Sequence, residues 1–152
     1  MYSPLHQEVI SEAETGWPHR QALLRAQIAS ANADVVCLQE CSAATFETDF
    51  EFMAELGFAR SELFKKGRFR PATFWRPERL VLRGEASHRD RCLITTFTRP
   101  SGGAPLSIVN CHLSAGPEAP RRLRQMADAL DFLRKDAAKV YHGYVGSFIL
   151  YF

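Results

Sequence analysis

The 152-residue sequence predicts a mixed α/β domain, and three observations carry this prediction. Two short apolar runs, within 34–40 and 106–113, have the length and β-branched content of buried strands. Other stretches carry apolar residues at helical spacing. Helices and strands alternate in a mixed order, which indicates helices packed outside a mixed sheet. The length and the 46% hydrophobic content allow one domain with a hydrophobic core.

The chain begins with a lead-in and a helix. Residues 1–16 are polar and aperiodic, so we expect them to be loosely held. Pro18 suits the first turn of a helix, where its missing N–H costs nothing. This helix should end near Asn32. Its expected apolar face consists of Leu23, Leu24 and Ile28.

The first strand and a second helix follow directly. The run Asp34–Glu40 is typical of a buried strand, because four consecutive apolar residues precede an amide and a carboxylate. Ser42 is a good N-cap for a helix that stops at Gly57. The apolar residues that this helix should bury are Phe46, Phe50 and Met53.

Residues 58–98 have the composition of several strands. Turn signals at Lys66-Gly67 and Arg76-Pro77 separate them. The candidate strands are Arg60–Phe64, Ala72–Trp75, Leu80–Arg83 and Cys92–Thr98.

A Gly/Pro-rich turn at 100–105 leads into the second apolar strand, Leu106–Leu113. Pro117 and Pro120 bracket the start of a third helix. Residues 140–152 form an apolar tail without Asp, Glu, Lys or Arg, which is compatible with one more strand. The residues that keep helical spacing along the third helix are Leu123, Met126, Leu130, Leu133 and Ala137.

The charge is balanced overall but uneven along the chain. A net charge of +2 gives no global field that would argue for nucleic acid. Residues 65–91, however, contain nine Lys or Arg side chains and three carboxylates. A concentrated basic stretch can bind a phosphate backbone, but the segment taken alone slightly favours a solvated face of strands and turns. Both interpretations stay open.

The four cysteines favour reduced thiols over a disulfide or a zinc site, since no Cys-x-x-Cys pair occurs. Cys37 and Cys111 lie inside the two apolar runs, where a free cysteine behaves as a small apolar residue. Residues 1–17 lack the features of a signal peptide, and no apolar run is long enough for a membrane span. We expect a cytoplasmic or nuclear protein. The sequence leaves its oligomeric state open.

Three polar residues close the two apolar strands. Glu40 offers a hard oxygen ligand of the kind that Mg²⁺ prefers. His112 can orient or protonate a phosphate oxygen near neutral pH. Asn110 shares a strand face with His112 and can donate a hydrogen bond to a phosphate. Since each residue alone is more often structural, the prediction of a hydrolytic metal site depends on their combination, with Glu40 and His112 facing each other at one edge.

These residues belong to an ordered set of motifs that resembles the endonuclease/exonuclease/phosphatase superfamily. Within this superfamily, the set resembles the branch of deadenylase-type and related phosphodiesterases. Trp17-Pro18-x-Arg20 resembles the family's Trp-x-x-Arg helix, and 35–40 resembles its Leu-Gln-Glu strand. Residues 72–76 resemble its central strand. Asn110-Cys111-His112-Leu113 resembles its Asn-Thr-His-Leu strand, and Arg122 with Gln125 resembles its Arg-x-x-Gln helix.

The resemblance implies a partial α/β sandwich over residues 17–139, between the lead-in at 1–16 and the divergent tail at 140–152. It implies Glu40 as a ligand of Mg²⁺, with Mn²⁺ as a substitute, and His112 and Asn110 as catalytic residues. The family's Gly-Asp-Phe-Asn and Ser-Asp-His motifs, with its general base, do not occur in the 152 residues, nor does its first metal-site Asn before Trp17. We therefore expect the second half of the sandwich to be missing, with Ile108, Val109 and Phe74 uncovered.

Two hypotheses follow. In the first, the chain is a metal-dependent phosphodiester hydrolase acting on nucleic acid, with RNA favoured, and the basic stretch favours a polyanionic substrate. In the second, it is a truncated and catalytically inactive fragment of such an enzyme, which serves at most as a binding or regulatory module. The sequence does not distinguish RNA, DNA, a nucleotide phosphodiester and a phosphoinositide as substrates.

Overall fold

The computed structural model describes residues 16–117, 119–140 and 147–151. It divides into two compact units, of which the first ends at Ala33 and the second begins at Asp34. The lead-in predicted at 1–16 lies outside the described residues, except for Gly16. The elements are α2 (Trp17–Ala31), β1 (Val35–Ser42), α3 (Phe46–Asp49), α4 (Phe52–Glu55), β2 (Arg60–Leu63), β3 (Phe69–Trp75), β4 (Val81–Leu82), β5 (Ser87–Arg89), β6 (Cys92–Thr98), β7 (Leu106–Cys111), α5 (Ala119–Val140) and β8 (Ser147–Tyr151).

The described part of the first unit is essentially the helix α2. Pro18 lies in its first turn, as predicted. The helix ends where Asn32 adopts a left-handed conformation with φ 44°. The guanidinium of Arg20 lies over the Trp17 ring, 5.9 Å from its centroid. The predicted helix is confirmed, although Leu23 of the expected apolar face is exposed.

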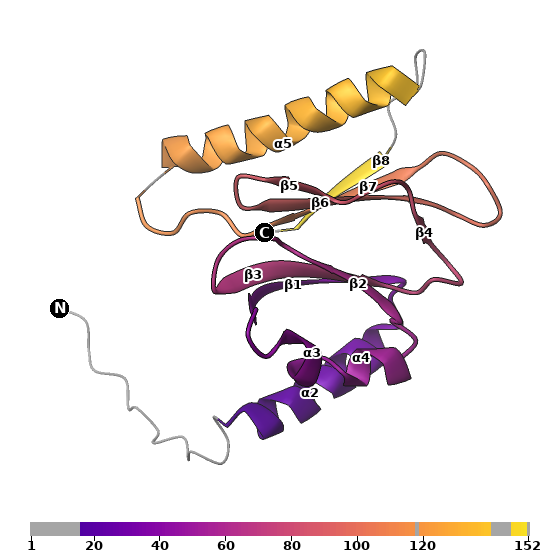
Figure 1. Cartoon of the computed structure of the whole chain (residues 1–152), viewed down its shortest axis with the longest axis vertical. Coiled ribbons are helices and arrows are strands. Elements are labelled where there is room, and N and C mark those ends of the chain that lie inside the picture. Colours follow the sequence, from indigo (N-terminus) through magenta and orange to yellow (C-terminus); the bar gives the residue numbers. More distant parts are fainter. Residues whose placement is uncertain (1–15, 118, 141–146, 152) are drawn as a thin grey trace. The chain divides into compact units, whose positions relative to one another are not determined.

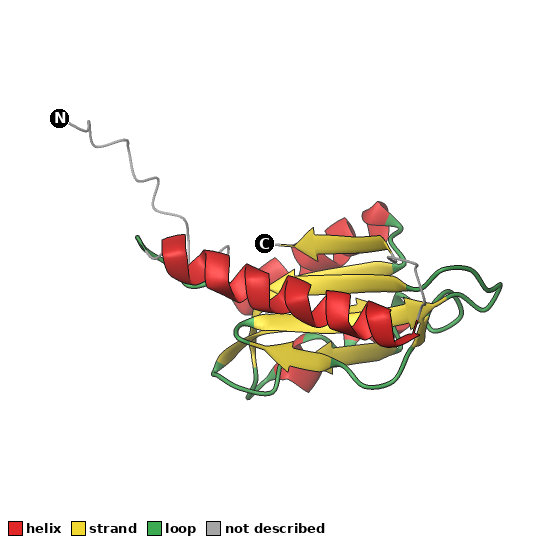
Figure 2. Cartoon of the chain, turned by 90° about the horizontal axis from the view of Figure 1, so that it is seen from above, coloured by secondary structure: helices red, strands yellow, loops and turns green. Residues whose placement is uncertain are grey.

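Within the described residues, the second unit contains two sheets and three helices. Figures 1 and 2 show α5 lying along one sheet, which contains β4, β5, β6, β7 and β8. A second sheet, with strand order β1-β3-β2, contacts the opposite face of the first through β1 and β3. In Figure 1, α3 and α4 lie on the outer side of this second sheet. The predicted mixed α/β sandwich with helices outside is therefore confirmed.

Strand alternation explains how each sheet buries side chains on both faces. In β7, Ile108 packs with Trp75 and Phe97 between the two sheets. Its neighbour Val109 packs toward α5, in a cluster that includes Ala129. This sheet is mixed, because β6 and β7 are antiparallel whereas β7 and β8 are parallel.

The expectation that Ile108, Val109 and Phe74 would be uncovered is wrong. All three are buried, since this chain itself forms both facing sheets. Phe74 points to the other side of β3, where it stacks on Phe46 and packs at a tilt against Phe50. The fold thus keeps these apolar side chains out of water without the second half of the sandwich that the resemblance implies.

The single helix predicted from Ser42 to Gly57 is also wrong. Ser42 is the last residue of β1, where it pairs with Phe69, so it is not an N-cap. Two short helices, α3 and α4, replace the predicted helix. The stop at Gly57 is confirmed: its φ of 87° favours glycine, and a Cβ there would collide with the guanidinium of Arg76.

Two further differences concern β5 and α5. Strand β5 was not predicted, because Ser-His-Arg carries no apolar alternation. The buried face of α5 centres on Gln125 and Ala129, while Leu123 is 66% exposed. The side chain of Ala137 lies outside the described residues.

The predicted apolar tail contributes one strand, β8, whose backbone pairs with β7 from Leu106↔Ser147 to Asn110↔Tyr151. The rest of the tail beyond Val140 lies outside the described residues. Among the helices that the structure describes, none has the length and apolarity needed to cross a bilayer.

Candidate functional site

Glu40 and His112 meet at one edge of the sandwich. Glu40 is in β1, and His112 directly follows β7 in the facing sheet. The distance from Glu40 Oε1 to His112 Nε2 is 3.6 Å, with side-chain exposures of 73% and 25%. The prediction that these two side chains face each other at one edge is confirmed. Both groups remain accessible to solvent and to a substrate.

A β-bulge aims the Glu40 side chain. Leu38 pairs with Ala72 and Cys41 pairs with Arg70, so Gln39 and Glu40 together lie opposite one residue of β3. Glu40 has φ 58°, a left-handed conformation that a non-glycine residue rarely adopts. Such outliers occur often at functional sites, where the surrounding structure holds them in place.

Asn110 connects the two sheets. Its side chain is fully buried and donates hydrogen bonds to the carbonyls of Leu38 (3.1 Å) and Ala72 (2.9 Å). Its Oδ1 accepts a hydrogen bond from Gln39 Nε2 at 2.8 Å. Both amide hydrogens are thus used within the fold. Asn110 fixes the end of β1 against β7, next to the two residues that form the candidate site.

The segment after His112 is held against α5 by the residues of the Arg-x-x-Gln motif. The buried Gln125 accepts a hydrogen bond from the Ser114 backbone N–H and donates one to Ser114 Oγ. Arg122 donates to the carbonyls of Ser114 and Gly116. On the other side, the His112 N–H donates to the Arg91 carbonyl at 2.8 Å. Hydrogen bonds therefore hold the backbone at His112 and in the segment that follows it.

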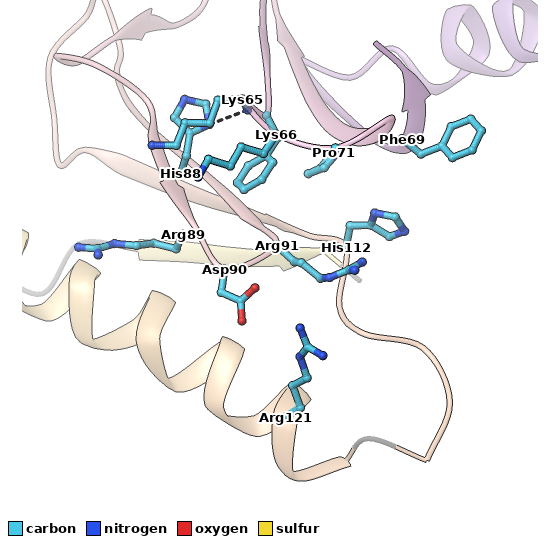
Figure 3. Close-up of a pocket in the computed structure, with 12 residues that line it drawn as sticks. Lys65, Lys66, Phe69, Pro71, His88, Arg89, Asp90, Arg91, His112 and Arg121 are labelled. Carbon is cyan, nitrogen blue, oxygen red and sulfur yellow. Dashed lines mark hydrogen bonds between the residues drawn. The ribbon is translucent and has the colours of Figure 1, made fainter. Parts of the chain in front are cut away.

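Two clefts share His112 as a lining residue. The first, of about 640 Å³, contains Glu40 and continues over Leu123 and Met126 of α5. The second, of about 580 Å³, lies among the β2–β3 turn, the β5–β6 turn and the start of α5 (Figure 3). It is basic: Lys65, Lys66, Arg89, Arg91 and Arg121 line it, with Asp90.

The sequence located this basic region only in part. Four of the five cations belong to the basic stretch 65–91, for which the sequence left both a phosphate-binding and a solvated surface open. The fifth, Arg121, comes from α5 and is brought to the cleft only by the fold. Burial and the nearby Lys65 ammonium lower the pKa of His88 below its ordinary value of 6.5. His88 Nδ1 also accepts a hydrogen bond from the Lys65 N–H at 3.3 Å.

The cysteines are free thiols. Cys92, Cys111 and Cys41 are buried, and Cys37 is half-buried. The Cys92 thiol donates to Cys111 Sγ over 3.5 Å, and this hydrogen bond together with burial raises the pKa of Cys92. Burial also raises the pKa of Cys37 to about 11. The placement of Cys37 and Cys111 inside the fold agrees with the sequence prediction.

The Glu40 edge offers a divalent cation one exposed carboxylate. Within the described residues, no cluster of three or more His, Cys, Asp or Glu side chains is able to hold a metal ion. Mg²⁺, however, commonly binds one or two protein carboxylates and keeps several waters. The exposed Glu40 carboxylate would supply one such ligand.

Comparison of the sequence with protein families gives one match. The Endonuclease/Exonuclease/phosphatase family matches residues 8–143. No curated protein sequence matches the chain significantly.

Solved structures share the fold. ANGEL2, described as a 2′,3′-cyclic phosphatase in complex with adenosine-2′,3′-vanadate, superposes with a TM-score of 0.78 at 18% identity, over 92% of this chain and 45% of that chain. The human Nocturnin catalytic domain with a bound sulfate gives 0.65 at 21% identity, over 83% and 54%. TDP2 from D. rerio with a single strand DNA product gives 0.62 at 18%, over 84% and 50%. The chain spans about half the length of these proteins.

Proposed function

Because the chain belongs to the endonuclease/exonuclease/phosphatase family, we propose that it forms part of a metal-dependent phosphodiester hydrolase acting on nucleic acid, with RNA favoured. The observation that carries this proposal is the convergence of Glu40 and His112, 3.6 Å apart, where two clefts meet. The basic cleft supports a polyanionic substrate. The solved relatives named above include complexes with adenosine-2′,3′-vanadate and with single-stranded DNA.

Each residue has a distinct role in this proposal. Glu40 holds Mg²⁺, or Mn²⁺ in its place. The ion, when bound, supplies Lewis-acid stabilisation of charge on a phosphoryl oxygen. His112 donates a hydrogen bond from its imidazole to a phosphate oxygen.

Asn110 supports both groups from inside the fold. Its hydrogen bonds to Leu38 and Ala72 fix the strand that ends in the bulge. We predicted Asn110 as a residue that contacts the phosphate, and that role stays a prediction. Its buried position favours a positioning role for the amide.

One observation favours the second hypothesis, that the 152 residues alone act only as a binding module. In the described part of the chain, Glu40 has no second carboxylate beside it that would complete a metal cluster. A general base contributes about 10²- to 10⁴-fold to such a reaction, and the motifs that carry it in the family do not occur in the 152 residues. We therefore expect the isolated polypeptide to have no measurable turnover.

The test compares two proteins. The first is the 152-residue chain, and the second joins it to a family segment with Gly-Asp-Phe-Asn and Ser-Asp-His. Hydrolysis of fluorescent RNA and DNA is followed with Mg²⁺, with Mn²⁺ and with EDTA. We expect activity only in the longer protein with a metal, and Glu40→Ala should abolish it, whereas the matched control Glu47→Ala should not. A fully active Glu40→Ala variant would contradict the proposed site.

A further inference from the structure

The basic cleft is a strongly charged hollow outside the Glu40–His112 pair. Lys65, Lys66, Arg91 and Arg121 are all exposed there. Between residues that the structure describes, no ion pair joins any of these four cations to a carboxylate. The cleft thus concentrates positive charge around a single acidic lining residue, Asp90. Such a surface attracts a chain of phosphates, because the protein's cations release the counterions that are condensed on the phosphates.

Two aromatic side chains line the same cleft, and in Figure 3 the Phe69 ring points away from Lys65 and Lys66. Phe69, at the start of β3, is 50% exposed and lines the cleft. Phe64 lies on the same side and packs at a tilt against His88, with 5.4 Å between the ring centroids. An exposed ring near cations, as Phe69 is here, can hold an unpaired base, because every base offers a face for stacking. A base-paired duplex does not expose those faces.

The cleft leads to the candidate site. His112 lines both the basic cleft and the cleft that contains Glu40. Figure 3 shows His112 and Arg91 extending to one side of the β5–β6 turn and Arg89 to the other. Arg89 lies over the Phe132 ring of α5, 4.5 Å from its centroid, so it is the least free of these cations to reach a ligand. A strand that follows the remaining cations arrives at His112.

We propose that the cleft lined by Lys65, Lys66, Phe69, Arg91 and Arg121 is a binding site for single-stranded nucleic acid, and that it leads the strand to the Glu40–His112 edge. The cations bind successive phosphates, and Phe69 stacks on a base. This proposal rests on the proposed function for the fate of the strand, but binding itself requires neither a metal nor turnover.

The test is therefore a binding measurement on the 152-residue chain in EDTA. Fluorescence anisotropy follows labelled single-stranded RNA and DNA 12-mers over a series of salt concentrations. The cleft variant is Lys65→Glu/Lys66→Glu/Arg121→Glu. The control variant, Arg99→Glu/Arg124→Glu/Lys135→Glu, changes the net charge equally at exposed residues that do not line the cleft. Circular dichroism establishes that both variants are folded.

We expect the affinity of the cleft variant for RNA to fall by at least about tenfold. The slope of log K against log salt concentration should become shallower by about 2. Phe69→Ala should weaken binding by about tenfold without changing the salt slope. Poly-glutamate should displace RNA poorly.

Equal weakening in the cleft and control variants would overturn the proposal, and so would equal displacement by poly-glutamate or absence of RNA binding at low salt. If the 152-residue chain binds RNA through the cleft but the longer protein does not cleave RNA, only the proposed function is contradicted. Cleavage by the longer protein with no effect of the cleft variant on binding would contradict this inference alone.

Discussion

Glu40 Oε1 lies 3.6 Å from His112 Nε2, although the two residues come from different sheets of the sandwich. Their proximity therefore depends on how the sheets are held together at this edge. In the described structure, buried hydrogen bonds from Asn110 join β7 to the other sheet, and a bulge in β1 sets the backbone conformation at Glu40. Each of these two features gives a separate prediction.

Replacing Asn110 should destabilise the fold. Asn110→Ala leaves the carbonyls of Leu38 and Ala72 and the amide of Gln39 without their buried partner, which should lower the free energy of unfolding by about 2–4 kcal/mol. Urea denaturation measures this. Ser107→Ala is the matched control on the same strand: it removes one partly buried bond to Thr96 and should cost about 1 kcal/mol or less. Equal losses in the two variants would contradict the role of Asn110 as the connection between the sheets.

Replacing Glu40 separates strain from charge. Because φ at Glu40 is 58°, Glu40→Gly should raise the free energy of unfolding by about 0.5–1 kcal/mol, after the entropy of glycine in the unfolded chain is deducted. Glu40→Ala removes the same carboxylate but keeps the unfavourable conformation, so it serves as the control and should give no such gain. If thermal and urea unfolding rank the alanine variant at or above the glycine variant, the bulge stores no strain.

The pKa of His88 should lie below 6.5, because burial and Lys65 both disfavour the imidazolium. A depressed histidine pKa contributes stability above pH 6.5, and this contribution is lost as the pH falls through the pKa of the folded state. Lys65→Gln should raise the pKa part of the way, since burial remains. NMR titration of the imidazole gives both values, with Arg134→Gln as the control. A wild-type pKa of 6.5 or higher would contradict the electrostatics described for the basic cleft.

The sequence predicted those elements whose own residues determine them. Pro18, the apolar run 35–38 and the Leu106 strand each carry a local signal, and each forms the predicted element. The helix predicted at 42–57 failed because the pairing of Ser42 with Phe69 extends β1, and this pairing is a long-range contact. Strand β5 exists only because it pairs with β6, so its three residues carry no periodicity of their own.

The candidate site was predictable to a similar extent. The strand ends and the resemblance located Glu40 and His112, and the distance between them confirms the prediction that they face each other. The left-handed φ of Glu40 and the inclusion of Arg121 in the basic cleft arise from strand register and helix placement. A single sequence states neither of these. Asn110 was chosen for its strand face, and the same alternation points its amide into the sandwich.

The central claim is that Glu40 holds a divalent cation beside His112, and Mn²⁺ tests it on the 152-residue chain itself. The ion broadens the NMR signals of nearby amides in a ¹⁵N-labelled sample. With one carboxylate and several waters, we expect weak binding, and Mn²⁺ should selectively broaden the signals of residues around Glu40 and His112. Mg²⁺ should reverse the effect by competition. Glu40→Ala should abolish the broadening, whereas Glu47→Ala should leave it unchanged. Broadening that persists in Glu40→Ala, or that centres on another carboxylate, would contradict the claim.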